Sequence, residues 1–236
     1  MKRFYKQVTV EKENGGYFVL LDGKKVKTPE KSPCLMPTRK MAEAVAKEWD
    51  DQDKDIKPAT MPIFKLVNTA IDRVGKRREE LINEMISFAG SDQLCYRAEA
   101  PDTLVELQNS MWNPLLDWLK DQFDIKLKLS TGIIFVEQDR VQLDKFRIIF
   151  EKMESFELTA LYTMITVTGS VTVGLSLFSG HQSLEQAWEA GHLDENFQAS
   201  EWGIDEEAER RRSALKTELA NADYFLKLTR GQETKK

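Results

Sequence analysis

The chain has 236 residues, of which 41% are hydrophobic and 31% are charged, and its formal net charge is −5. This composition is typical of a globular protein with a substantial core and argues against a disordered chain. Non-specific binding of nucleic acid is disfavoured, because it requires clustered positive charge and the basic runs here are short and are mostly interrupted by acids.

The first thirty residues carry the pattern of a small antiparallel sheet. Residues 8–10 alternate between apolar and polar side chains, and residues 17–21 form an apolar run. The glycine-containing segments 14–16 and 22–23 supply turns that tolerate a positive φ. We therefore expect a meander that continues through residues 24–28 and needs another element to cover its apolar face.

A helix is predicted to follow this meander. Thr38 is a suitable N-cap, and an apolar stripe at helical spacing comes after it, formed by Met41, Ala42, Val45, Ala46 and Trp49. Pro58 and Pro62 are then expected to bracket a short extended linker between domains. The predicted division is a β-rich N-terminal domain over residues 1–60 and a larger α-helical domain over residues 61–236, an α+β fold.

Helical periodicity dominates after Pro62. Apolar stripes at helical spacing recur along the second domain, within residues 63–74, 81–86, 104–111 and 146–153. The pair Asn113-Pro114 is typical of a cap and a first-turn proline, so a new helix is predicted to begin there. Residues 132–137 are ambiguous and fit either a strand or a buried turn of helix.

One stretch without charged residues, 158–180, is long enough to suggest a transmembrane helix. It contains five threonines, however, and Gly169-Ser170 interrupts it near the middle. Basic flanking residues are absent as well. We therefore interpret it as two buried helices that meet at a tight break, and expect no stable membrane insertion.

Helix caps mark the C-terminal part of the chain. Ser183 begins a capping box with Gln186, and Asp194 is predicted to cap a short helix that ends at Gly203. Asp205 is expected to open the last helix. The predicted buried seam of that helix consists of Leu215, Leu219, Ala222 and Leu226.

The sequence offers no constellation for chemistry. Neither a dinucleotide-binding glycine motif nor a phosphate-binding loop is present, and no Gly-x-Ser-x-Gly elbow occurs. Cys34 and Cys95 lack metal-ligand spacing. His181 and His192 lie eleven residues apart and could be drawn as a metal site with the acids at 194–195, but nothing forces the two rings to converge. We predict no catalytic residue, no cofactor and no metal.

Short motifs occur in order along the chain and together resemble one known family. They are Arg3-Phe4-Tyr5-Lys6, Leu21-Asp22-Gly23, Lys27-Thr28-Pro29, Glu48-Trp49 with Gln52, Met61-Pro62, Asn68-Thr69-Ala70-Ile71-Asp72, Asp92 with Leu94-Cys95-Tyr96-Arg97, Trp112-Asn113-Pro114-Leu115, Gly169-Ser170, Ala187-Trp188, Asp194-Glu195 with Gln198, and Trp202-Gly203 before Glu207-Ala208. The set resembles the assembly factor family that chaperones the alpha subunit of ATP synthase. It departs from the family pattern at Gln93 and Asn113, where Leu and Asp are expected.

The resemblance implies an ATP-independent chaperone rather than an enzyme. Its partner would be the free alpha subunit of the catalytic head, held until the beta subunit replaces the chaperone, and the chain would be monomeric when free. No presequence is apparent, which favours a bacterial, cytoplasmic member, with the mitochondrial matrix as the compartment of organellar relatives. Two alternatives stay open: a small-molecule enzyme that uses acidic residues, and a permanent structural adaptor.

An acidic region near the C-terminus is the candidate client-binding site. Its residues are Asp194, Glu195, Trp202, Glu206 and Glu207. The acids have a simpler explanation, since carboxylates stabilise helix starts. They would also give electrostatic selectivity around an aromatic anchor if they face the client. Glu207 is favoured within this set because Asp205 already supplies the cap.

Overall fold

The computed structural model describes residues 1–13, 15–132, 134–203 and 205–232. Packing divides the chain into two compact units. The first unit contains residues 1–78, 154–160 and 221 onward, and the second contains residues 79–153 and 161–220. The α+β class is confirmed, with antiparallel strands near the N-terminus and helices through most of the remainder. The domain division at residue 60 stays a prediction.

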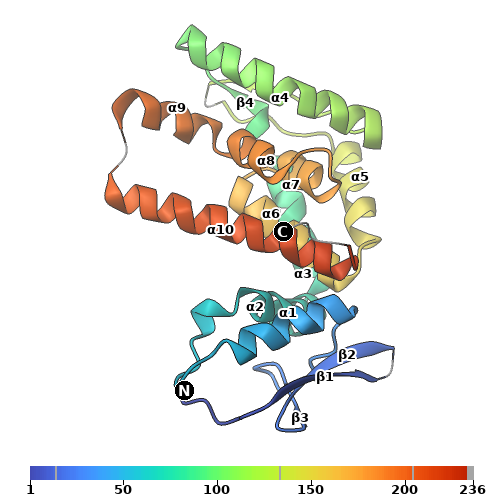
Figure 1. Ribbon diagram of the computed structural model, residues 1–236. Helices are drawn as coiled ribbons and strands as arrows, with labels where there is room; N and C mark the ends of the chain where they lie inside the picture. The colour runs from blue at the N-terminus through green and yellow to red at the C-terminus, as the bar shows by residue number, and fades with distance from the viewer. Residues whose placement is uncertain (14, 133, 204, 233–236) are drawn as a thin grey trace. The chain divides into compact units, whose positions relative to one another are not determined.

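The strands of the first unit form the expected meander. They are β1 (Val8–Glu13), β2 (Gly16–Leu21) and β3 (Lys24–Lys25), antiparallel in the order β1-β2-β3. In this register Val8 lies opposite Leu21, and Leu20 lies opposite Lys25. Helix α1 (Arg39–Asp50) packs against β1 and β2 and covers the apolar face of the sheet (Figure 1).

Helix α1 begins as its sequence predicts. Thr38 Oγ1 accepts a hydrogen bond of 3.2 Å from the Met41 amide, which satisfies one of the free N–H groups of the first turn. Met41, Ala42, Val45 and Trp49 are buried, so the predicted apolar stripe faces the core.

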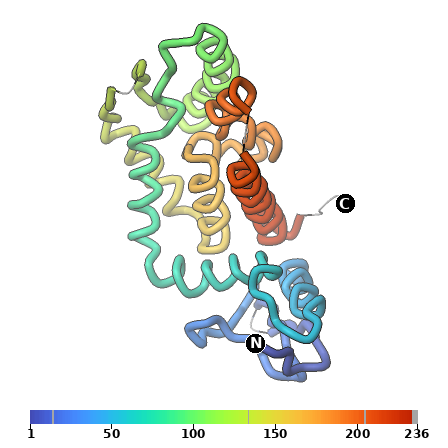
Figure 2. Tube along the Cα trace, turned by 90° about the vertical axis from the view of Figure 1, so that its left-hand side faces the viewer, coloured from blue at the N-terminus to red at the C-terminus, as the bar shows by residue number. Residues whose placement is uncertain are grey.

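The prolines after α1 do not bracket an extended linker, and that prediction is wrong. Pro58 starts the 3₁₀ helix η1 (Pro58–Thr60), and Pro62 starts α2 (Pro62–Asn68). Proline is tolerated at the first helical position because its missing N–H would have no partner there. The Glu48 carboxylate caps α2 instead, accepting from Ile63 N at 2.7 Å and Phe64 N at 2.8 Å. A π-helical segment, η2 (Thr69–Val74), continues α2 as one rod (Figure 2).

Two distant segments complete the first unit. They come from the start of α6 (Ser155–Thr168) and the end of α10 (Glu206–Thr229). The rings of Phe156 and Phe225 stack with their centroids 5.9 Å apart. Thr38 Oγ1 also donates to the Leu228 carbonyl at 2.6 Å, which ties α1 to the C-terminal segment.

The second unit is mostly helical. In addition to parts of α6 and α10 it contains α3 (Arg78–Gly90), η3 (Gln93–Cys95), α4 (Asp102–Phe123), α5 (Arg140–Glu151), α7 (Val171–Phe178), α8 (Leu184–Gly191) and α9 (Leu193–Trp202). It also contains β4 (Tyr96–Arg97) and β5 (Ser130–Thr131), which pair in parallel. These two strands are too short to have given a pattern in the sequence.

The uncharged stretch forms two buried helices, as predicted. Gly169 adopts a φ of +67° at the break between α6 and α7, a conformation that glycine reaches without strain. Ser170 then caps α7, and its hydroxyl accepts from Val173 N at 3.1 Å. Among the residues that the structure describes, no helix combines the length and the hydropathy needed to cross a bilayer.

Gly174 allows α7 to approach α6 closely. A Cβ atom at this position would lie 2.7 Å from Ile165 Cγ1 and 3.1 Å from the Ile165 amide nitrogen. We expect Gly174→Ala to destabilise the protein by about 1–2 kcal/mol, because overpacking outweighs the gain in helix propensity. Urea unfolding measures this, with Gly90→Ala as the control, since no neighbouring atom lies within 4 Å of the corresponding Cβ. Equal stability of the two variants would contradict the close approach.

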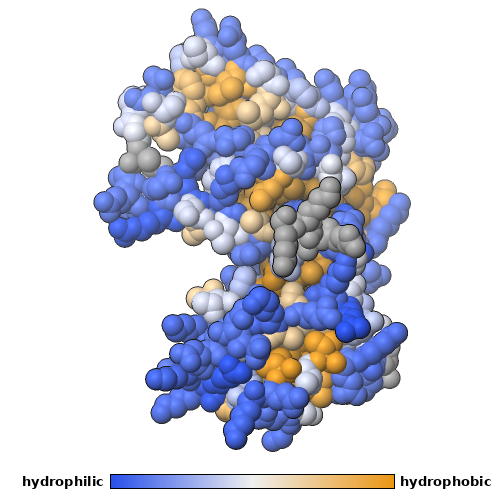
Figure 3. Space-filling model, in the orientation of Figure 1, coloured by the Kyte–Doolittle hydropathy of each residue, from blue (hydrophilic) through white to orange (hydrophobic). Residues whose placement is uncertain are grey.

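Helix α4 does not restart at Pro114, which corrects the prediction at Asn113-Pro114. The helix is continuous, with Pro114 in its interior. Pro114 has no backbone N–H, so α4 lacks one of its hydrogen bonds there. The burial of Trp112, Leu115 and Leu119 near the proline offsets this loss. The apolar stripe predicted within residues 104–111 also differs from the structure, because Gln108 is buried whereas Leu107 is 37% exposed. Figure 3 shows hydrophobic residues gathered over α4 on the visible surface.

Residues 132–137 form neither of the two predicted structures. The described residues of this stretch belong to no strand or helix, and Ile134 and Phe135 are 71% and 67% exposed; residue 133 lies outside the described residues. An apolar run becomes buried only where another element covers it. Here Gln138 is the buried residue, and its side-chain amide bonds the backbone N–H and carbonyl of Lys128 at 2.8 and 2.9 Å.

Candidate functional site

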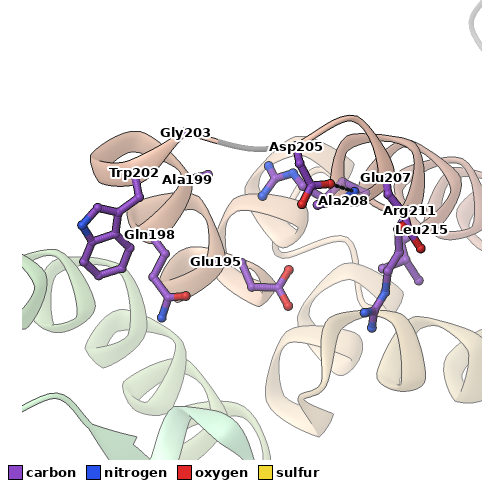
Figure 4. A pocket seen from close by; sticks show the side chains of 11 residues that line it. Glu195, Gln198, Ala199, Trp202, Gly203, Asp205, Glu207, Ala208, Arg211 and Leu215 are labelled. Atoms are coloured by element: carbon purple, nitrogen blue, oxygen red, sulfur yellow. Dashed lines mark hydrogen bonds between the residues drawn. The ribbon is translucent and has the colours of Figure 1, made fainter.

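A cavity of about 520 Å³ lies where α9 and α10 face each other. Gly203 ends α9 with a φ of +77°, as its position after the last apolar residues predicts. Asp205 opens α10, and its carboxylate accepts from Ala208 N at 2.8 Å, which confirms the predicted cap. Residues of both helices line the cavity (Figure 4).

Three of the five predicted client-binding residues line this cavity. They are Glu195 and Trp202 of α9 and Glu207 of α10. Trp202 is 79% exposed, which is unusual for such a large apolar side chain. In Figure 4 the Trp202 ring lies at one end of this group and Glu207 at the other. One cavity is therefore lined by an exposed aromatic side chain and, at other positions, by carboxylates.

Asp194 has an internal role instead. It lies in the first turn of α9 and does not cap it, because His192 occupies the N-cap position. The predicted cap at Asp194 is therefore wrong. Asp194 Oδ1 accepts a hydrogen bond of 2.8 Å from Gln108 Nε2 of α4. This bond holds the side chain against the neighbouring helix.

Glu206 lies outside the cavity, on the exposed side of α10. Its carboxylate forms an ion pair of 2.9 Å with Arg210 one turn along the helix. Both side chains are almost fully solvated, so the pair contributes at most about 0.5 kcal/mol. Glu206 and Glu207 therefore have similar chemistry but different surroundings.

The cavity also has residues that the sequence analysis did not select. Arg211 and Leu215 follow Glu207 at intervals of four residues and so lie on the same face of α10. Arg212 Nη1 is buried without a hydrogen-bond partner among the described residues, and Arg212 Cζ lies 5.9 Å from the Trp188 ring centre. Arg211 and Leu215 could have been predicted from the sequence, because their spacing of four residues from Glu207 places them on the same helix face.

The surrounding chain is strongly acidic. Residues 194–209 contain seven acidic residues and no lysine or arginine: Asp194, Glu195, Glu201, Asp205, Glu206, Glu207 and Glu209. Three arginines follow directly at 210–212. A surface of this kind favours partners with a basic rim and disfavours acidic ones.

Residues 2–120 match the family described as ATP12 chaperone protein. The chain belongs to the ATP12 chaperone family. It is 26% identical over 234 residues to mitochondrial protein atp12 of Schizosaccharomyces pombe, a match that covers 94% of this chain and 80% of that protein. Two solved structures of Atp12 from Paracoccus denitrificans, one of them a point mutant, are 36% identical and cover 97% of this chain with a TM-score of 0.92. The matches cover 97% of the mutant's chain and 98% of the other Paracoccus chain.

A third solved structure supports the same assignment. The Atu1473 protein of Agrobacterium tumefaciens is 39% identical, and the match covers 96% of this chain and 85% of that one with a TM-score of 0.90. The ATP12 family consists of chaperones for ATP synthase assembly, which is not a class of enzyme. The family pattern that the sequence motifs indicated is therefore confirmed.

The histidines and cysteines of this ATP12-family chain occupy structural positions. His192 is buried and stacks on Trp188 with ring centres 3.8 Å apart, and burial lowers the pKa of its imidazole. His181 stacks on Trp118 instead. Cys34 and Cys95 are free and buried, and burial raises the pKa of the Cys34 thiol to about 12. Within the described residues, no group of three or more His, Cys, Asp or Glu side chains is placed to hold a metal.

Proposed function

We propose that this chain binds the free alpha subunit of the ATP synthase catalytic head and prevents its aggregation until the beta subunit replaces the chaperone. Membership of the ATP12 family supports the role in assembly. We choose this site because the exposed Trp202 lines the same cavity as Glu195 and Glu207. Tryptophan is enriched among the residues that dominate binding at protein interfaces, and charged groups around it add selectivity.

The mechanism requires no chemical step. A subunit that waits for its partner exposes the apolar surface that the partner will cover, and such surfaces aggregate. A chaperone that covers this surface reduces the concentration of the aggregating species by mass action. Release follows when a partner of higher affinity competes for the same surface. The chain would act in the bacterial cytoplasm or, in organellar relatives, in the mitochondrial matrix.

Glu207→Lys is expected to weaken the protection of the client about tenfold while the fold stays intact. The substitution places a positive charge in the cavity, which repels a basic client surface. Light scattering of refolding alpha subunit measures protection, and thermal unfolding measures the fold. We expect about tenfold more variant to be needed for equal protection, from a loss of roughly 1.4 kcal/mol.

Glu206→Lys is the matched control, because it makes the same charge change one residue away and outside the cavity. It should protect the client almost as well as the native chain does. Equal losses in the two variants would show that overall charge acts, and normal protection by Glu207→Lys would place the binding surface elsewhere. A sharp fall in melting temperature would assign Glu207 to the fold.

The purified protein is expected neither to bind nor to hydrolyse ATP. Its sequence contains no phosphate-binding loop, and competition alone accounts for client release. Titration calorimetry with Mg-ATP should therefore give no heat beyond dilution. Micromolar binding of ATP to the isolated protein would contradict the passive mechanism.

A further inference from the structure

The first unit contains a groove that the proposed function does not use. It has a volume of about 330 Å³ and lies between the N-terminal segment, the β2–β3 hairpin and helices α1 and α2. Its apolar walls consist of Phe4, Leu21, Val26, Trp49 and Phe64. Three lysines of the hairpin and its continuation, Lys24, Lys25 and Lys27, line it as well.

The floor of the groove is preformed. Trp49 is 6% exposed and contacts Tyr5 and Phe64 edge-on, with ring centres 5.6 and 5.2 Å away. Tyr5 Oη donates a hydrogen bond of 2.5 Å to the Trp49 carbonyl, which fixes the backbone at this position. Phe4, by contrast, is 64% exposed at the edge of the groove. An occupant therefore meets a rigid apolar floor and an exposed aromatic ring.

The charged residues that line the groove are all lysines. Lys25 Nζ forms an ion pair with Glu13 and lies 4.5 Å from the centre of the Phe18 ring. Lys24 and Lys27 form no ion pair with any residue that the structure describes, and both are exposed. Lys24 also helps to lower the pKa of the nearby Asp22 carboxyl, and both ammonium groups are accessible to an anionic ligand.

The acids nearest the groove already have partners. Asp22 accepts from the backbone N–H groups of Lys6 and Gln7. Asp72 accepts from the hydroxyl of Thr28, and Glu48 accepts from the first amides of α2. None of these three carboxylates lines the groove, whereas Lys24 and Lys27 do.

We propose that this groove docks a segment of a protein partner in which a bulky apolar side chain is flanked by aspartate or glutamate. The apolar side chain would pack against Trp49 and Phe64, and the acidic flanks would pair with Lys24 and Lys27. The groove would bind an acidic segment, whereas the acidic cavity in the second unit favours a basic partner surface. The proposal for the groove does not depend on which client binds the cavity. The groove is a second docking site on the chain.

A peptide fits the groove better than a nucleic acid does. Strong binding of phosphates requires several cationic contacts, whereas the groove has two lysines without an ion pair, and the whole chain has a net charge of −5. The aliphatic walls at Leu21 and Val26 suit a side chain such as Leu or Phe.

The test uses the full chain and a capped peptide of sequence Asp-Glu-Asp-Phe-Leu-Glu-Asp. NMR of the ¹⁵N-labelled protein follows the indole N–H signal of Trp49, assigned from its absence in Trp49→Phe. We expect this signal to move on titration and the affinity to fall about tenfold in Lys24→Glu/Lys27→Glu, where two attractions become repulsions. Added salt should weaken binding in the same direction.

The control Lys54→Glu/Lys57→Glu makes the same charge change at exposed lysines of the first unit that do not line the groove. It should bind the peptide normally, as should Glu207→Lys, so failure of the client proposal and failure of this one are distinguishable. The proposal is overturned if the Trp49 signal does not move at millimolar peptide, or if both double variants bind equally. It is also overturned if a ten-residue oligothymidylate moves that signal more strongly than the peptide does.

Discussion

Replacing Asp92 with asparagine should lower the free energy of unfolding by about 2–3 kcal/mol, because it leaves buried donors without acceptors. Asp92 is completely buried. One carboxylate oxygen accepts from Leu94 N at 3.0 Å, and the other accepts from both the amide and the hydroxyl of Thr172 at 3.0 Å. An asparagine retains one acceptor oxygen and turns an N–H₂ group toward an N–H donor.

Chemical unfolding with urea measures this effect, and its pH dependence gives a second readout. Burial raises the pKa of Asp92 above its ordinary value of 3.8, despite its hydrogen bonds. The native state therefore holds this proton more tightly than the unfolded state does. As pH rises from 3.8 to the raised pKa of the native state, the contribution of Asp92 to the free energy of unfolding falls. The difference in free energy of unfolding between the native chain and Asp92→Asn should become smaller from pH 3.8 upward. A gap that widens there would contradict the assignment.

Trp112→Ala is expected to cost about 4 kcal/mol, since it opens a large cavity in the second unit. Trp112 is 2% exposed, and its indole Nε1 donates a hydrogen bond of 2.9 Å to the Ala190 carbonyl at the end of α8. The guanidinium of Arg97 lies 5.2 Å from the ring centre, so the buried Arg97 loses a neighbour as well.

Two further substitutions separate the effect of the lost side-chain volume at Trp112 from the effect of its lost hydrogen bond and of removing any tryptophan. Trp112→Phe keeps much of the volume but removes the hydrogen bond, and it should cost about 1–2 kcal/mol. Trp202→Ala removes the same type of side chain from an exposed position and should leave the melting temperature almost unchanged. If Trp202→Ala destabilises the fold as much as Trp112→Ala does, Trp202 is a packing residue and not a docking residue.

Local signals in the sequence predicted local structure well. The caps at Thr38, Ser183 and Asp205 are confirmed, because each depends on a hydrogen bond to an amide three residues away. The break at Gly169-Ser170 is confirmed for the same reason. These features need no knowledge of the rest of the fold.

The wrong predictions concern residues whose structure depends on distant partners. Asp194 resembles a cap, but Gln108, eighty-six positions earlier, determines its role. Pro114 resembles a helix start, but packing around Trp112 keeps α4 continuous. The cavity was predicted in part: Trp202 and Glu207 were selected from motifs, whereas the approach of α9 to α10 that brings in Arg212 leaves no local pattern.

The composition of the first unit from three separate segments has a consequence for biosynthesis. Its strands and α1 are translated first, yet Thr38 bonds a carbonyl 190 positions later, near the end of the chain. Contacts so distant in sequence form slowly and late. On the ribosome this unit therefore stays incomplete until its segment from residue 221 onward has been synthesised, and incompletely packed apolar surfaces favour aggregation during that time. A member of a chaperone family is thus itself prone to aggregation while this segment is still missing.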